Sequence, residues 1–149
     1  MYGLVGVDKV QHSLFPSIIW CDSRAVEIGE KAFEQIGEER CLTHLLNSPG
    51  NFTASKLAWV KQFRPAEYKK IHKIMLPGDF ISMKLTGEIT TSISSLSEGV
   101  FWDFKERHLS ADVMDYFQFD ASLIPDIQDV FSDHGNLEAR MASAMSLPS

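Results

Sequence analysis

The sequence lacks the features that mark several large classes of protein. No apolar run approaches the ~18 residues that a membrane-spanning helix needs, and no basic segment followed by an apolar one marks a secretory signal. Its two cysteines, Cys21 and Cys41, lack the spacing of metal ligands. We therefore expect a cytoplasmic protein with reduced thiols and with no membrane partner.

Sequence patterns that bind phosphate or supply a nucleophile are also missing. "GLVGVD" has two glycines, but no helix is expected directly after it, as a dinucleotide-binding loop requires. Asp133-His134-Gly135-Asn136 precedes an expected helix, and we interpret it as a loop rather than a phosphate-binding hairpin. No Gly-x-Ser-x-Gly motif is present. The five histidines are scattered, so we interpret them as solvated or capping residues and expect no metal site.

Positive charge is scarce. The chain has 14 Lys and Arg against 20 Asp and Glu, a net charge of -6, which argues against a nucleic-acid partner. Lys69, Lys70 and Lys73 cluster, and we interpret them as a solvated helix face rather than a phosphate site. An apolar content of 44% in 149 residues is typical of one globular domain.

What is present is a small amount of strand followed by helix. Tyr2–Val7 and Leu14–Trp20 alternate like two neighbouring strands. The spacing then becomes helical, with Asp22 or Ser23 as the expected cap of a helix that closes at Gly37. Further helices are expected over 38–46, 53–64 with Thr53 as cap, 65–74, 79–87 with Asp79 as cap, 111–117 and 136–145. Residues 88–91 and 122–127 are expected to be extended, and 92–97 to be a loop or a polar helix start. The predicted class is α/β.

Trp20 and Asp22 are candidates for ligand binding. They follow an expected strand, and open α/β sheets bind ligands where strands end. An indole face can pack on the C–H groups of a sugar while nearby polar groups bond its hydroxyls. The alternative is that Trp20 lies in the core and Asp22 only caps a helix, and local spacing alone favours that alternative.

Lys56 and Trp59 lie three residues apart and so share one face of a helix. The lysine stem can cover the indole while the ammonium bonds a carbonyl or a carboxylate. We prefer this structural role to a catalytic one.

Several blocks of the sequence resemble the FGGY family of carbohydrate kinases. "NFTASKLAWVKQF" resembles the family's first signature, although Asn51 and Phe63 depart from it. The residues that fit are Thr53, Lys56, Leu57, Trp59 and Val60. "PSIIWCDSRA", "NSPGNFTASK", "IMLPGDFISMKLTGE" and "SEGVFWDF" resemble further family segments in the same order, covering about residues 1–135. Within the family the resemblance is greatest to the xylulokinases.

The resemblance implies a fold and a set of sugar contacts. It implies that residues 1–149 are part of an RNase H-like, actin-like N-terminal domain that binds sugar, without its first strands and without the C-terminal nucleotide domain. Met1 matches the methionine of a Gln-Met-His-Gly motif that contacts sugar, and Tyr2 replaces its histidine. Trp20 matches a substrate-contacting tryptophan of related glycerol kinases. The expected substrate-binding residues are therefore Met1, Tyr2, Trp20 and Asp22, with no catalytic residue.

The resemblance also implies an activity for a longer parent protein. That parent would convert ATP and D-xylulose, a keto-pentose, to ADP and D-xylulose 5-phosphate. ATP and Mg²⁺ would bind the full-length parent and not this piece, which would be inactive alone. The alternative is a non-catalytic helical module that binds sugar or a protein. Because the missing strands would pair beside Tyr2–Val7, we also expect an exposed edge there and self-association.

Overall fold

The computed structural model describes residues 2–147, and its strands in that range form three two-stranded sheets. Strand β1 (Val5–Val7) pairs antiparallel with β2 (Lys73–Met75), with Val5 opposite Met75. On the other side of β1, residues 13–18 run antiparallel through isolated bridges, and Leu4 and Ile18 exchange two N–H···O bonds of 2.9 and 3.0 Å. The front strand, residues 4–7 with β1, therefore has neighbours on both sides, and the predicted unpaired edge at Tyr2–Val7 is wrong.

Two other predictions about this part of the chain fail. Residues 14–20 form no regular strand, although Leu14 N donates to the Gly6 carbonyl of β1 and Ile18 bridges to Leu4. The helix predicted over 65–74 ends early as α4 (Pro65–Tyr68), and the chain then enters β2. A strand of three residues is too short to show a period, so pairing with β1 decides its conformation. Lys69 and Lys70 are exposed as predicted, but Lys73 donates to the Ile124 carbonyl at 2.8 Å.

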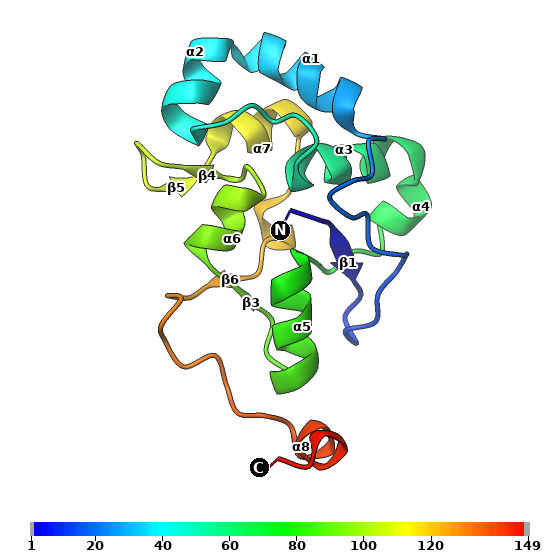
Figure 1. Ribbon diagram of the computed structural model, residues 1–149. Coiled ribbons are helices and arrows are strands. Elements are labelled where there is room, and N and C mark those ends of the chain that lie inside the picture. Colours follow the sequence, from blue (N-terminus) through cyan, green and yellow to red (C-terminus); the bar gives the residue numbers. More distant parts are fainter. Residues whose placement is uncertain (1, 148–149) are drawn as a thin grey trace.

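One end of the molecule is helical (Figure 1). Helix α1 (Val26–Ile36) contacts both α3 (Thr53–Phe63) and α7 (Ala111–Phe117). It ends at Gly37, whose φ of 100° suits glycine, and α2 (Glu38–Arg40) continues into a π-helical turn (Cys41–Leu45). These elements confirm the predicted helices over 38–46, 53–64 and 111–117 and the predicted helix that closes at Gly37, although α1 starts later than a cap at Asp22 or Ser23 predicts.

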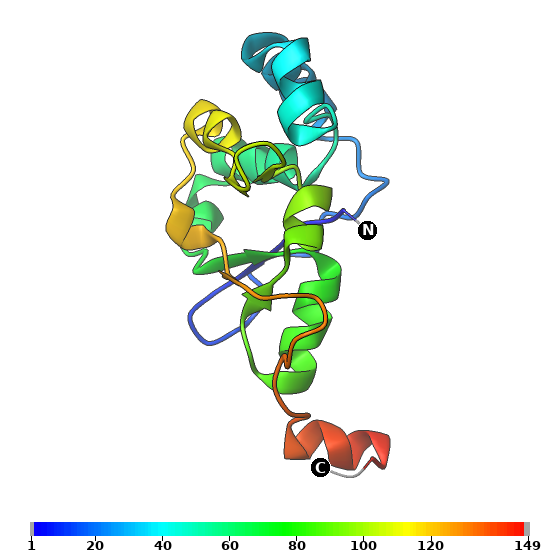
Figure 2. The same cartoon turned by 90° about the vertical axis from the view of Figure 1, so that its left-hand side faces the viewer.

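The other end of the molecule is built around α5 (Pro77–Thr86), which closes at Gly87 in the left-handed conformation. Strand β3 (Thr90–Thr91) pairs in parallel with β6 (Asp126–Ile127), which follows a 3₁₀ turn (Ala121–Leu123). Residues 93–98 form α6 (Ile93–Glu98), so the helical alternative for the serine-rich segment is confirmed. Helix α8 (Ala139–Met145) starts three residues later than predicted and projects at the end of an extended segment (Figures 1 and 2).

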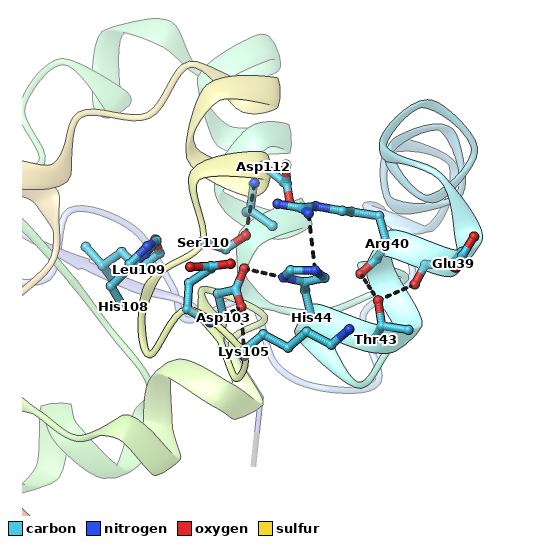
Figure 3. Close-up of polar contacts among 12 residues, drawn as sticks. Glu39, Arg40, Thr43, His44, Asp103, Lys105, His108, Leu109, Ser110 and Asp112 are labelled. Carbon is cyan, nitrogen blue, oxygen red and sulfur yellow. Dashed lines mark hydrogen bonds and ion pairs between the residues drawn. The ribbon is translucent and has the colours of Figure 1, made fainter.

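A hairpin of β4 (Trp102–Asp103) and β5 (His108–Leu109) was not predicted. It is fixed by a buried polar group, in which His44 Nδ1 lies 2.8 Å from Asp103 Oδ2 and His44 Nε2 lies 3.1 Å from Arg40 Nη1 (Figure 3). A guanidinium only donates, so Nε2 accepts from Arg40, while Nδ1 faces the Asp103 carboxylate. The interpretation of every histidine as solvated or capping is therefore wrong for His44.

Residues on β1 alternate between two apolar clusters. Leu4 packs in the main core with side chains from α3, α6 and α7, whereas Val5 and Val7 pack with Met75 and Met83 of the α5 side. The front strand thus lies between the two halves of the molecule and positions the residues that precede it. Cys21 and Cys41 are free thiols, as predicted. No helix within residues 2–147 is long and apolar enough to cross a membrane.

Candidate functional site

The turn between the bridge at Ile18 and helix α1 carries Trp20 on its surface. The indole is 60% exposed, so the alternative that placed Trp20 in the core is wrong. Asp22 does not cap the following helix, because α1 begins after Ala25 and has no side-chain cap. The turn is closed instead by backbone bonds from Asp22 N to Ile19 O and from Val26 N to Ser23 O, both 3.1 Å.

Asp22 and Arg24 form a two-point ion pair in this turn. Oδ1 accepts from Arg24 Nε at 2.8 Å and Oδ2 from Nη2 at 2.6 Å. These bonds lower the pKa of Asp22, so its carboxylate is ionised near neutral pH. The guanidinium in turn lies 4.6 Å from the ring centre of Trp59, a cation–π distance. Arg24 therefore covers a face of Trp59, a partner that the sequence patterns did not predict.

Asn51 ties the turn to the loop before α3. Its Nδ2 donates to the carbonyl of Asp22 at 2.7 Å and to that of Trp20 at 3.3 Å. The loop itself is held against α1, because a Cβ added at Gly29 would lie 1.7 Å from the Gly50 carbonyl oxygen. Only a glycine at position 29 permits this close approach, and the approach fixes where Asn51 sits.

Lys56 supports the same loop from inside the molecule. The residue is 0% exposed, and its Nζ donates to the Asn51 carbonyl. This confirms the predicted carbonyl partner. Burial lowers the pKa of Lys56 to about 8, while the charge of Asp22 and the Cys21 thiol oppose that shift. The ammonium also lies 5.5 Å from the ring centre of Tyr2.

Tyr2 is held beside this loop by Phe52, with the two ring centres 4.4 Å apart. Thr53 is the first residue of α3 rather than its cap, and its hydroxyl donates to the Gly3 carbonyl at 3.1 Å. That bond anchors the front strand to α3. Three of the four predicted sugar contacts, Tyr2, Trp20 and Asp22, thus converge on Asn51 and Lys56. Met1, the fourth, lies outside the described residues.

Sequence analysis did not identify Asn51 or Lys56 as organisers of the site. For Lys56 the available signal was its position among the small and apolar residues of α3. This position predicts that the lysine is buried, but it does not predict which group its ammonium bonds. The signal for Asn51 was its departure from the family signature. Its partners lie 29 and 31 residues earlier in the chain, a pairing that only the fold reveals.

Asp79 forms a second, partly buried polar group in the α5 half. Its carboxylate accepts from the hydroxyls of Thr91 and Ser95, both at 2.8 Å, and so joins α5 to β3 and α6. It does not cap α5, whose N-terminal flanking residue is Leu76. Burial raises the pKa of Asp79 despite these bonds. Within residues 2–147 no three His, Cys, Asp or Glu side chains gather as metal ligands.

Comparison with known proteins identifies the family. Residues 1–149 match the family described as "FGGY family of carbohydrate kinases, N-terminal domain". Xylulose kinase of Staphylococcus xylosus is 29% identical over 150 residues, covering 100% of this chain and 31% of that protein. Xylulose kinase of Escherichia coli K12 is 33% identical over 114 residues, covering 76% of this chain and 23% of that protein.

Solved structures agree with the sequence relatives. The structure of xylulose kinase from Rhodospirillum rubrum matches with a TM-score of 0.87 and 25% identity, over 99% of this chain and 30% of that one. A kinase structure from Brucella ovis matches with a TM-score of 0.84 and 27% identity, over 100% of this chain and 30% of that one. The predicted actin-like kinase fold is confirmed, and the chain spans about a third of its relatives' length. The chain belongs to the FGGY family of carbohydrate kinases and matches its N-terminal domain.

Proposed function

We propose that this chain forms the sugar-binding wall of a kinase that transfers phosphate from ATP to D-xylulose, giving D-xylulose 5-phosphate and ADP. The relatives named xylulose kinase support the substrate class, since they align with the whole chain. The observation that carries the proposal is the exposed indole of Trp20, fixed beside the ionised Asp22 by Asn51. We propose that the complete enzyme works in the cytoplasm.

The chemistry of the turn suits a keto-pentose. Such a sugar presents C–H groups, which pack on an indole face, and hydroxyls, which donate to a carboxylate. Trp20 supplies the first surface and Asp22 the second, while Tyr2 packs on Phe52 of the same loop, near the Lys56 ammonium. Together with Met1 these residues form the proposed sugar contacts.

The proton that leaves the attacking sugar hydroxyl needs a carboxylate with a free oxygen. The carboxylates inside the fold are already occupied, Asp79 by two hydroxyls and Asp103 by His44 and two backbone N–H groups. Arg24 lowers the pKa of Asp22, which makes that carboxylate a weak proton acceptor. The described residues also offer no set of ligands for Mg²⁺. We therefore propose that the catalytic base and the ATP and Mg²⁺ sites belong to the rest of the parent enzyme.

Calorimetric titration with D-xylulose tests this function. We expect the 149-residue chain to bind the ketose, and Trp20→Ala to weaken binding at least about tenfold, the effect of losing an aromatic stacking contact. Phe131→Ala is the control, because it removes another exposed aromatic side chain from a different part of the molecule.

An ATP-coupled assay on the same preparation should show no phosphorylation of D-xylulose. Turnover by the chain alone would contradict the assignment of the reactive groups to the rest of the parent. Absence of ketose binding would favour the alternative, a non-catalytic module that binds another protein.

A further inference from the structure

We propose that Lys56 is a positioning residue, whose buried ammonium acts through Asn51 to hold the Trp20–Asp22 turn in its sugar-binding orientation. The inference rests on the proposed function of that turn, and it assigns a task to a residue that touches no sugar itself. It also explains why a charged side chain lies at the centre of α3.

A buried ammonium is costly unless its charge and its hydrogen-bond donors are used. Lys56 is 0% exposed, and no carboxylate in residues 2–147 lies within ion-pair distance of its Nζ. What Nζ contacts is the Asn51 carbonyl and the face of the Tyr2 ring. A methionine at this position would fill similar space without the desolvation cost, so the ammonium serves its polar contacts rather than packing.

The connection from Lys56 to the turn passes through one residue. Lys56 holds the main-chain carbonyl of Asn51, and the side-chain amide of Asn51 holds the carbonyls of Trp20 and Asp22. The preceding residue of the loop lies against α1, where the Gly50 carbonyl meets Gly29. Loss of the bond to the Asn51 carbonyl therefore removes one of the contacts that fix the position of the Asn51 amide.

The protonation of Lys56 has two effects of opposite sign. Its pKa is lowered from the ordinary 10.5 to about 8 by burial, so between these values the unfolded chain binds more protons than the folded one. Stability therefore rises with pH across this window. Over the same window the ammonium is lost, and the hold on Asn51 weakens. A merely structural lysine would give the first effect without the second.

Other titratable groups face Lys56 and need controls. Asp22 is ionised throughout this range because Arg24 lowers its pKa. The Cys21 thiol lies in the same turn, and the Tyr2 phenol lies across the ammonium. The measurements are therefore made in a Cys21→Ser background.

The experiment measures D-xylulose affinity by calorimetry from about pH 7 to about pH 9.5. We expect the affinity of the parent background to fall about fivefold, the effect of one hydrogen bond. Lys56→Met should bind weakly and show no change with pH. Asn51→Ala keeps the lysine but removes the link, and it should also be weak and independent of pH. Lys61→Met is the matched control, since its ammonium on the same helix donates to Phe117 and Gln118 instead.

A second measurement needs no sugar. In protein labelled with 5-fluorotryptophan, the ¹⁹F resonance of Trp20, assigned from Trp20→Phe, should shift or broaden as pH rises, and Lys56→Met should abolish the change. If no variant binds ketose, the proposed function fails, and this resonance alone decides whether Lys56 positions the turn. The inference would be overturned if the Trp20 resonance of Lys56→Met matched that of the parent background at every pH. It would also be overturned if Lys56→Met bound ketose with the same affinity as the parent background.

Discussion

At the scale of single residues, buried charges in this chain are matched by groups that the fold holds in place. Asp103 accepts from the backbone N–H groups of Lys105 and Glu106, both at 2.9 Å, and from His44. Burial alone would raise the pKa of Asp103, but these hydrogen bonds outweigh it and lower the pKa. Asp79 shows the reverse balance, because burial there outweighs its two hydroxyl donors.

The lowered pKa of Asp103 gives a prediction about acid stability. Its contribution is fully present above the unfolded value near pH 4 and is lost as pH falls through the lower folded value. Asp103→Asn should lower the free energy of unfolding at pH 7 by about 2–3 kcal/mol, since His44 and the backbone N–H groups of Lys105 and Glu106 lose their buried anionic acceptor. Urea unfolding measures this effect. Asp112→Asn removes only the outer ion pair with Arg40 and should cost less than about 1 kcal/mol; equal losses in both variants would count against the buried group.

At the scale of elements, close packing of α1 on the loop 47–52 sets the geometry of the sugar-facing turn. Gly29→Ala places a methyl group against the Gly50 carbonyl, where no flexible side chain can yield. We expect a loss of about 2–4 kcal/mol in unfolding free energy. Gly78→Ala is the matched control, because nothing lies within 4 Å of its added Cβ, and it should be neutral or slightly stabilising. Thermal unfolding that ranks both variants alike would show that the close approach is absent in solution.

Sequence patterns predicted the elements whose signals are local. Helices α1 and α5 end at Gly37 and Gly87 as predicted, and α7 spans Ala111–Phe117 as predicted. Strand β2 and the hairpin of β4 and β5 were missed, since strands of two or three residues have no readable period. The expected helix caps at Thr53 and Asp79 were wrong because each side chain has a partner elsewhere in the fold. Asp22 instead pairs with Arg24 in the turn, and α1 begins only after Ala25.

In the candidate site, too, only the residues with local signals could be predicted from the sequence. Trp20 and Asp22 could be picked out from local sequence and resemblance, and the structure places them on one turn. The role of Asn51 depends on contacts with residues far earlier in the chain, which no local pattern contains. Lys56 could be predicted to bond a carbonyl, but not which carbonyl.

At the scale of the whole molecule, the chain exposes apolar side chains away from the sugar-facing turn. β1 offers no free edge, so the prediction of self-association now depends on the segment around Val130 and Phe131, where the phenyl ring is 102% exposed. We expect concentration-dependent association of the 149-residue chain in sedimentation velocity, reduced in Phe131→Ser. A monomer at every concentration, or association unchanged by Phe131→Ser, would contradict this prediction.

The claim on which this account depends is that the turn from Trp20 to Asp22 faces the sugar. The most direct test is to titrate D-xylulose into ¹⁵N-labelled chain and follow each backbone amide and the tryptophan indoles by NMR. The account predicts saturable shifts at Tyr2, Trp20, Asp22 and Asn51, with the amides of α5 and α8 unmoved. Saturable shifts that spare this turn and gather elsewhere would contradict it.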